Sequence, residues 1–249
     1  MMGKRQEYCR NLEELPEWDE YLLEQSGLPG PRGNLELAHA VADVGSRKLF
    51  ARYVGLDAER APTNDPHEFL AFCGVLGMGR LLAEGDRGAL IPIRRAAGDP
   101  RWRLREACAQ ALQRWGDVDM ESLCLLMSDW AGGTLLERRA AAAALCEPRL
   151  LKSPKQARTV LEILDRITVG IRDIEDRRAD GFRVLRQGLG YGWSVAVSAL
   201  PEVGCPMFER WLDDRDVDIR WIVRENLKKK RLERLDADWM ARCLEQINR

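Results

Sequence analysis

Histidine, aromatic residues and long uncharged stretches are scarce in this sequence of 249 residues. The two histidines, His39 and His67, give little material for a histidine-based metal cage or a Ser-His-Asp triad. The longest stretch without a charged residue covers residues 187–201 and contains three glycines, so it falls short of the roughly 18 apolar residues that span a membrane. We therefore expect a soluble protein with no metal site and no membrane partner.

Disulfide and targeting signals are lacking as well. The seven cysteines are odd in number and include no C-x-x-C pair, so the sequence indicates neither a disulfide framework nor a zinc site. Residues 1–10 are polar and lack the hydrophobic segment of a secretory signal. We expect reduced thiols, no cofactor and a cytoplasmic location. The net charge of -1 means that a nucleic acid would have to be held by a local basic patch.

Strand signals are almost absent, whereas apolar residues recur at helical spacing along most of the chain. Proline follows Asp65, Asp99 and Ser153, which is typical of the first turn of a helix. The sequence therefore predicts an all-α protein. The expected helices cover residues 16–26, 34–54, 66–84, 87–97, 100–115, 119–130, 134–147, 154–178, 181–199, 206–213, 217–231 and 236–248.

The beginning of the chain differs from the rest in charge and in turn content. Residues 1–70 hold 13 acidic against 8 basic residues, and residues 27–33 are rich in glycine and proline. We expect residues 1–33 to form an acidic lead or cap that is partly linker-like. Residues 34–249 would then form a single domain.

A short pattern, Asp-x5-Arg with an apolar residue before the arginine, occurs three times. It covers residues 99–106 (DPRWRLRE), 180–187 (DGFRVLRQ) and 218–225 (DIRWIVRE). A fourth copy at residues 134–145 keeps the arginine, Arg138, but has Gly132 in place of the aspartate. The steps between the arginines suit one helix pair per repeat.

The pattern has a physical rationale in stacked helices. An aspartate before a helix caps its exposed amides, and an arginine six residues later can reach that aspartate or the one in the neighbouring copy. Apolar residues near each arginine form a stripe that one helix pair cannot bury alone. The expected structural pairs are Asp99 with Arg105, Asp180 with Arg186 and Asp218 with Arg224.

These segments resemble HEAT repeats over residues 66–232. The resemblance implies a right-handed α-solenoid of stacked helix pairs. Within that family, residues 130–145 and 220–232 are somewhat similar to the bacterial AlkD and AlkC group of DNA alkylation repair proteins. That resemblance implies DNA binding in a concave basic groove, and for the glycosylases of the group a set of Trp, Asp and Arg side chains facing the groove.

Candidate groove residues are cations that the repeat does not use, two tryptophans outside the apolar stripe, and the aromatic residues Tyr191 and Trp193 of a glycine-rich segment, although Trp193 also falls on the stripe. Trp102 and Trp221 precede the repeat arginine by three residues, which places them about 120° from the stripe. The sequence Gly-x-Gly-x-Gly at residues 188–192 has no preceding strand and no Lys-Ser/Thr, so it is better explained by close helix packing than by nucleotide binding. The candidates are Arg101, Trp102, Arg139, Arg183, Tyr191, Trp193, Arg220, Trp221 and Lys228.

No catalytic constellation is recognisable, so an enzyme is not the favoured interpretation. We expect a binding scaffold that holds a protein or a nucleic acid backbone on the concave face of the solenoid. The alternative is an AlkD-like DNA repair protein or glycosylase, although no acidic residue with an adjacent aromatic residue is a convincing counterpart of that active site. A chaperone-lyase acting on a pigment or cofactor would rest on fold analogy alone.

Overall fold

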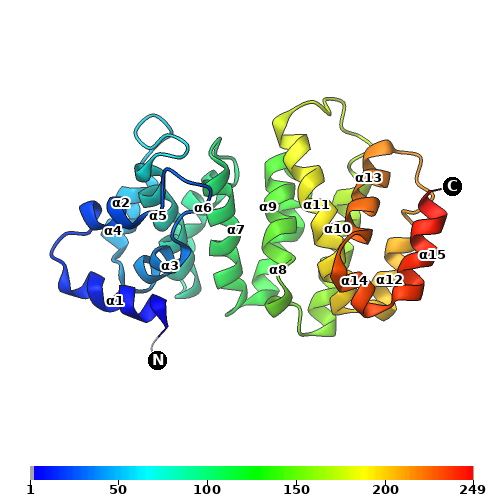
Figure 1. Cartoon of the computed structure of the whole chain (residues 1–249), viewed down its shortest axis with the longest axis horizontal. Coiled ribbons are helices and arrows are strands. Elements are labelled where there is room, and N and C mark those ends of the chain that lie inside the picture. Colours follow the sequence, from blue (N-terminus) through cyan, green and yellow to red (C-terminus); the bar gives the residue numbers. More distant parts are fainter. Residues whose placement is uncertain (1–2, 249) are drawn as a thin grey trace. The chain divides into compact units, whose positions relative to one another are not determined.

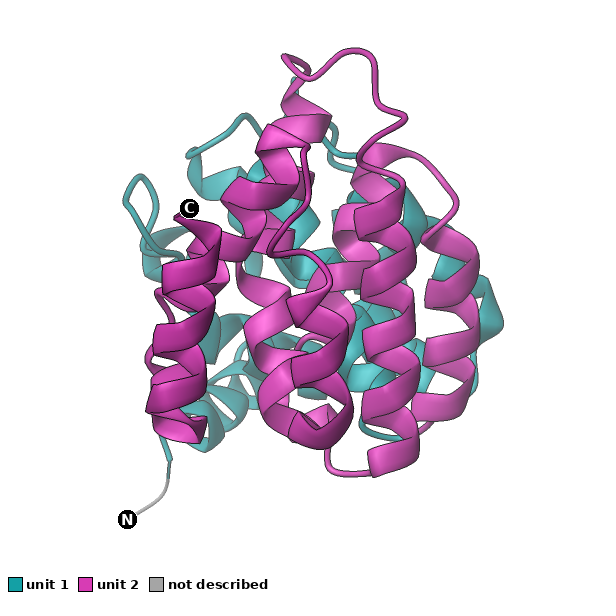
Figure 2. Ribbon diagram, turned by 90° about the vertical axis from the view of Figure 1, so that its right-hand side faces the viewer, with its two compact units in different colours: residues 1–118 teal, residues 119–249 magenta. Residues whose placement is uncertain are grey.

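The computed structural model describes residues 3–248, and within this range all regular structure is helical (Figure 1). None of the described helices is both long enough and apolar enough to cross a membrane. The chain divides into two compact units, residues 1–118 and residues 119–249, which are coloured separately in Figure 2. The prediction of an all-α protein is confirmed for the part of the chain that the structure describes.

Unit 1 is built around one central helix, α5. Its helices are α1 (Lys4–Glu14), α2 (Asp19–Gln25), α3 (Leu35–Val44), α4 (Arg47–Val54), α5 (Pro66–Ala83), α6 (Leu90–Ala97) and α7 (Trp102–Gly116), with a 3-10 turn at Arg87–Ala89. Helix α5 packs against α3, α4 and α7, and almost all of its residues are buried. Glycines permit this close packing, because a Cβ at Gly77 would overlap the ring of Phe50 in α4 and one at Gly79 would overlap the Ala111 backbone in α7.

Unit 2 contains two layers of helices. Its helices are α8 (Met120–Trp130), α9 (Leu135–Leu145), α10 (Pro154–Val169), α11 (Asp180–Ala199), α12 (Pro201–Glu209), α13 (Val217–Leu227), α14 (Lys230–Leu235) and α15 (Ala237–Ile247), with a 3-10 turn at Pro148–Leu150. In one layer, α11 packs between α9 and α13 (Figure 1); in the other, α10 packs between α8 and α12. Trp193 and Phe208 meet between the layers with ring centroids 5.9 Å apart, so aromatic side chains fill this core.

Several predicted helix boundaries need correction. The helix expected at residues 34–54 is two helices, because the Ser46 side chain caps α4 by accepting a hydrogen bond from the Leu49 amide. The helix expected at residues 217–231 is also two, since α13 ends at Leu227 and α14 begins at Lys230. Helix α10 ends at Val169, nine residues before its predicted end at 178. Helix α1 was not predicted, because its buried side is limited to Leu12.

Candidate functional site

Unit 1 contains a cavity of about 330 Å³ beside α5. Phe69 and Phe72 of α5 line it together with residues 31–35 and with residues of α7. Trp102, at the start of α7, borders the cavity and is 45% exposed. The complete lining is Pro31, Arg32, Gly33, Leu35, Phe69, Phe72, Trp102, Arg103, Glu106 and Gln110. A concave, largely apolar site with a few polar groups is the usual form of a ligand pocket.

A buried ion pair fixes one side of this cavity. Glu68 is fully buried, and its Oε2 accepts hydrogen bonds from Arg103 Nη1 at 3.0 Å and from the Asn64 amide at 2.7 Å. Arg103 Nη2 also donates to the Gly30 carbonyl at 2.6 Å, and the Gly30 amide donates to Asn64 Oδ1 at 3.0 Å. The segment before α3 is thereby tied to α5 and α7. Separating the two buried charges would be costly, so the pair keeps α5 and α7 together beside the cavity.

Unit 2 presents a surface with exposed aromatic side chains where α11 and α13 lie side by side. Tyr191 is 45% exposed, and the Arg231 guanidinium lies 4.7 Å from its ring centroid and donates to its hydroxyl. The half-buried Trp221 ring lies against Gly190, with the Arg186 guanidinium 4.3 Å from its centroid. We call this surface the α11–α13 face. Its residues are Arg183, Gln187, Tyr191, Trp221, Glu225, Lys228 and Arg231.

The charges of the α11–α13 face are mixed in sign. Arg183 pairs with Asp180 at 2.9 Å, and Lys228 pairs with Glu225 at 2.5 Å. Both cations are largely exposed, yet each has a carboxylate within reach on its own helix. The face is therefore aromatic and partly charge-compensated.

An ion network connects the loop before α11 to the start of α13. Arg177 binds both oxygens of Asp216, at 2.8 and 2.6 Å, and also binds Asp218 at 2.9 Å. Arg186 binds the other oxygen of Asp218. The Arg177 hydrogen bond holds the pKa of Asp216 below its ordinary value, and the two carboxylates raise the pKa of Arg177. The Asp216 carboxylate thus remains charged in the folded state.

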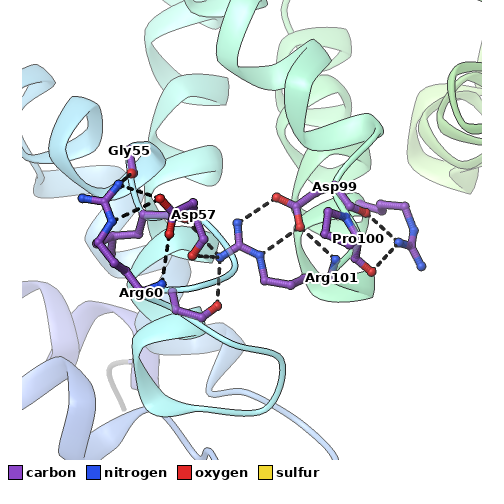
Figure 3. A network of polar contacts seen from close by, with 9 residues as sticks. Gly55, Asp57, Arg60, Asp99, Pro100 and Arg101 are labelled. Carbon is purple, nitrogen blue, oxygen red and sulfur yellow. Dashed lines mark hydrogen bonds and ion pairs between the residues drawn. The ribbon is translucent and has the colours of Figure 1, made fainter.

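Arg101, expected to be a groove cation, is instead a buried structural residue. Its guanidinium binds the Asp99 carboxylate at 2.9 and 2.7 Å, and its Nη1 donates to three main-chain carbonyls, those of Leu56, Asp57 and Ala61 (Figure 3). The same arginine borders a second cavity of about 240 Å³ in unit 1. Arg101 is held in this position by Asp99, two residues away, which binds its guanidinium beside the loop after α4.

Trp193, a candidate groove residue, is buried. Its side chain is 1% exposed, and its Nε1 donates to Thr168 Oγ1 at 3.0 Å. The glycines around it permit helix packing, since a Cβ at Gly192 would lie 2.9 Å from Cys146 Sγ. Trp193 therefore belongs to the core of unit 2.

The other predicted cations lie in different surroundings. Arg139 of α9 is half-buried beside Gly188 of α11. Arg220 donates to the Ile247 carbonyl at the end of α15, as does Arg224 at 3.1 Å. Tyr191 and Trp221 lie where α11 and α13 meet, whereas Arg183 is an exposed cation at the start of α11 and Lys228 one at the end of α13. Trp102 lies in unit 1, at the cavity.

The aspartates and arginines of the repeat do not pair as expected within each copy. Asp180 binds Arg183, and Arg186 binds Asp218 of the next copy. Arg105 donates to the main-chain carbonyls of Asp99 and Pro100. The cap of α13 is Asp216, whose side chain accepts from the amides of Asp218 and Ile219.

Sequence reasoning missed most of the cavity lining. Leu35, Phe69 and Phe72 were expected only as members of helices, and the buried Glu68 gave no signal because a single glutamate in a helix is ordinarily exposed. Arg103 lies three residues before Glu106 on α7, and nothing in the local sequence distinguishes it from the neighbouring arginines. The available signal was the isolated glycine-proline segment at residues 27–33, which the structure places beside the cavity.

The cysteines offer no nucleophile near these sites. All seven are free thiols, and five are buried. Burial raises the pKa of Cys146 to about 12 and that of Cys124 to about 11, so both remain protonated at neutral pH. Over residues 3–248, no three His, Cys, Asp or Glu side chains gather in a way that could hold a metal ion.

Comparisons of the chain with protein-family models, curated protein sequences and solved structures found no match. The class that the structure itself defines is an all-helical protein. The resemblance to HEAT repeats rests on the internal repeat.

Proposed function

We propose that unit 2 is a short right-handed α-solenoid of HEAT-like helix pairs, with α8–α9, α10–α11 and α12–α13 as successive repeats. The layered packing supports this proposal, because α9, α11 and α13 occupy one layer and α8, α10 and α12 the other. The bond from Arg186 to Asp218 supports it further, since it joins corresponding segments of adjacent pairs. In unit 1, α4–α5 and α6–α7 are the candidate pairs.

The function we propose is that of a binding scaffold that holds a protein partner on the α11–α13 face. The observation that carries this proposal is the pair formed by the exposed Tyr191 and the half-buried Trp221, each with an arginine guanidinium over its ring. Tyr, Trp and Arg are the residue types enriched at the energetic centres of protein interfaces. In this proposal the aromatic rings enter the partner and the paired charges form the rim.

A nucleic acid backbone is the less favoured partner of this face. A surface that binds phosphates needs cations that are free to replace counterions. Here Arg183 and Lys228 each have a carboxylate partner on the same helix. The AlkD-like alternative would require a continuous basic groove, and it predicts DNA binding that weakens steeply with salt.

Site-specific photo-crosslinking tests the proposal. A photoreactive phenylalanine analogue is placed at Gln187, which is exposed on the α11–α13 face, and in a separate variant at Leu125, which is 76% exposed on α8. We expect a specific protein to be captured from position 187 and not from position 125. That protein is then purified, and its affinity is measured for the wild type and for Tyr191→Ala, Trp221→Ala and Leu125→Ala.

The two aromatic variants should weaken binding by about tenfold or more, and Leu125→Ala should leave it unchanged. Circular dichroism melting curves establish that the aromatic variants remain folded. Equal affinity of all four proteins would contradict the proposal. Retention of a short DNA duplex at low salt, lost on adding salt, would favour the DNA-binding alternative.

A further inference from the structure

The cavity of unit 1 is lined by residues between positions 31 and 110, none of which belongs to the α11–α13 face. An inference about its ligand is therefore independent of the proposed function. Its shape is held by the Glu68–Arg103 pair and by the Gly30–Asn64 hydrogen bond described above. A site supported by rigid side chains is largely formed before the ligand arrives. The cost of ordering the cavity walls on binding is therefore small.

The lining favours a flat apolar group. Three aromatic side chains, Phe69, Phe72 and Trp102, border the cavity. The exposed Leu35 borders it as well. Aromatic rings gain most from another ring in an offset or edge-to-face arrangement, beyond the gain from buried area. A volume of about 330 Å³ is at the lower end for ligand sites, which suits a small molecule with one or two fused rings.

The polar groups of the lining determine the charge that a ligand needs. Arg103 is neutralised by Glu68, and Glu106 takes part in another interaction. The side chains of Arg32 and Gln110, in contrast, have no hydrogen-bond or ion-pair partner among the described residues. The lining therefore offers one arginine and one amide side chain without a partner, beside the Glu106 carboxylate, which is engaged in an interaction of its own. A carboxylate is the group that an arginine binds best, through two parallel hydrogen bonds.

We propose that this cavity binds a small planar aromatic carboxylate. The ring system packs against Trp102 and the two phenylalanines, and the carboxylate binds Arg32. Gln110 hydrogen-bonds a second polar substituent of the ligand, so the site distinguishes between aromatic carboxylates that have such a substituent and those that lack it.

Isothermal titration of the full chain with 2-naphthoate tests this proposal, with the neutral 2-naphthylmethanol as the matched compound. We expect naphthoate to bind with one site per chain and naphthylmethanol to bind more weakly. Arg32→Gln should weaken naphthoate by about tenfold or more and leave naphthylmethanol unchanged. The control Lys48→Gln removes a positive charge from an exposed position of α4, outside the cavity, and should change neither affinity.

The apolar part of the proposal has its own variants. Leu35→Glu places a carboxylate at the cavity and should abolish binding of both compounds, whereas Ile91→Glu, at an exposed position of α6, should not. Trp102→Ala should weaken both compounds. Melting curves check that each variant is folded, and Leu35→Glu alone suffices if Trp102→Ala unfolds. Absence of naphthoate binding to the wild type, or binding that survives Leu35→Glu, would overturn the proposal.

Discussion

Arg186 in α11 donates a hydrogen bond to Asp218 in α13, 32 residues further along the chain. The two residues belong to consecutive copies of the Asp-x5-Arg pattern, so the pattern connects one copy to the next. Arg177, from the loop before α11, binds the same carboxylate from another direction. Asp218 is buried, and its charge is therefore compensated from two sides.

This arrangement predicts a strong energetic coupling between Arg186 and Asp218. Arg186→Ala and Asp218→Ala should each lower the free energy of unfolding by about 1–3 kcal/mol, because each leaves a charged partner incompletely paired. In a double-mutant cycle measured by urea denaturation, the coupling should exceed about 1 kcal/mol. The control is the exposed pair Arg183–Asp180, whose coupling should lie between 0 and about 1 kcal/mol. Equal coupling in the two cycles would refute a structural role for the Arg186–Asp218 pair.

Asp216 should make the stability of unit 2 depend on pH in the acidic range. Its pKa is lowered in the folded state, chiefly by the hydrogen bond from Arg177, so its contribution is fully present above the unfolded pKa of about 4 and is lost as the pH falls through the folded pKa. Asp216→Asn keeps an oxygen to cap α13 but removes the charge. We expect it to cost about 1–3 kcal/mol at pH 7 and to reduce the loss of stability between pH 5 and pH 2.

The matched control for this variant is Asp173→Asn. Asp173 is an exposed carboxylate in the same connection between α10 and α11, with no hydrogen-bond or ion-pair partner among the described residues. Urea denaturation across the pH range should give the same curve for Asp173→Asn as for the wild type. If the stability of Asp216→Asn varied with pH as that of the wild type does, the assignment of the acid-range pH dependence to Asp216 would be contradicted.

Glycines in two helices should respond in opposite ways to replacement by alanine. In an exposed helix interior this change usually stabilises by about 1 kcal/mol. At Gly79 of α5 the new Cβ would lie 2.5 Å from the Cα of Ala111 in α7, so the helices would have to separate. We expect Gly79→Ala to destabilise by at least about 1–3 kcal/mol.

Gly188→Ala in α11 provides the comparison. The nearest atom to its new Cβ is Arg139 Cγ at 3.8 Å, an ordinary contact, so this variant should be as stable as the wild type or more stable. Thermal denaturation of both variants and the wild type measures the two changes in melting temperature. A Gly79→Ala protein that melts at or above the wild-type temperature would show that the α5–α7 contact is less close than described.

The helical class could be predicted from the sequence because periodicity alone indicates it, as the matching bounds of α5 and α8 illustrate. Several helix ends could not. Whether residues 34–54 form one helix or two depends on a competition. The tendency of Ser46 to cap a new helix must outweigh the tendency of its neighbours to continue the helix before it. The pairing of the repeat residues was predictable only as a choice between the same copy and the next. That choice depends on how far α11 and α13 are offset along their axes, which no local pattern contains.

The candidate sites were predictable to a smaller extent. Helical position correctly placed Trp102 away from the core, since angle along a helix is a local property. Helical position also placed Trp193 on the apolar stripe, in agreement with its burial against Thr168 of α10, whereas its choice as a groove residue rested on the glycines around it and was wrong. The unit 1 cavity arises from residues 31–35, α5 and α7 together, so only the tertiary structure reveals it.

The burial of Trp193 and the exposure of Tyr191, two residues apart in α11, lead to the last prediction. Trp193→Ala should destabilise unit 2 by about 3–5 kcal/mol, as expected for removing a buried tryptophan, whereas Tyr191→Ala should cost less than about 1 kcal/mol. Thr168→Val should cost about 1–3 kcal/mol, because it leaves the Trp193 indole N–H buried without its acceptor. Chemical denaturation monitored by far-UV circular dichroism measures all three values. If Trp193→Ala cost as little free energy of unfolding as Tyr191→Ala, the burial of Trp193 in the core of unit 2 would be contradicted.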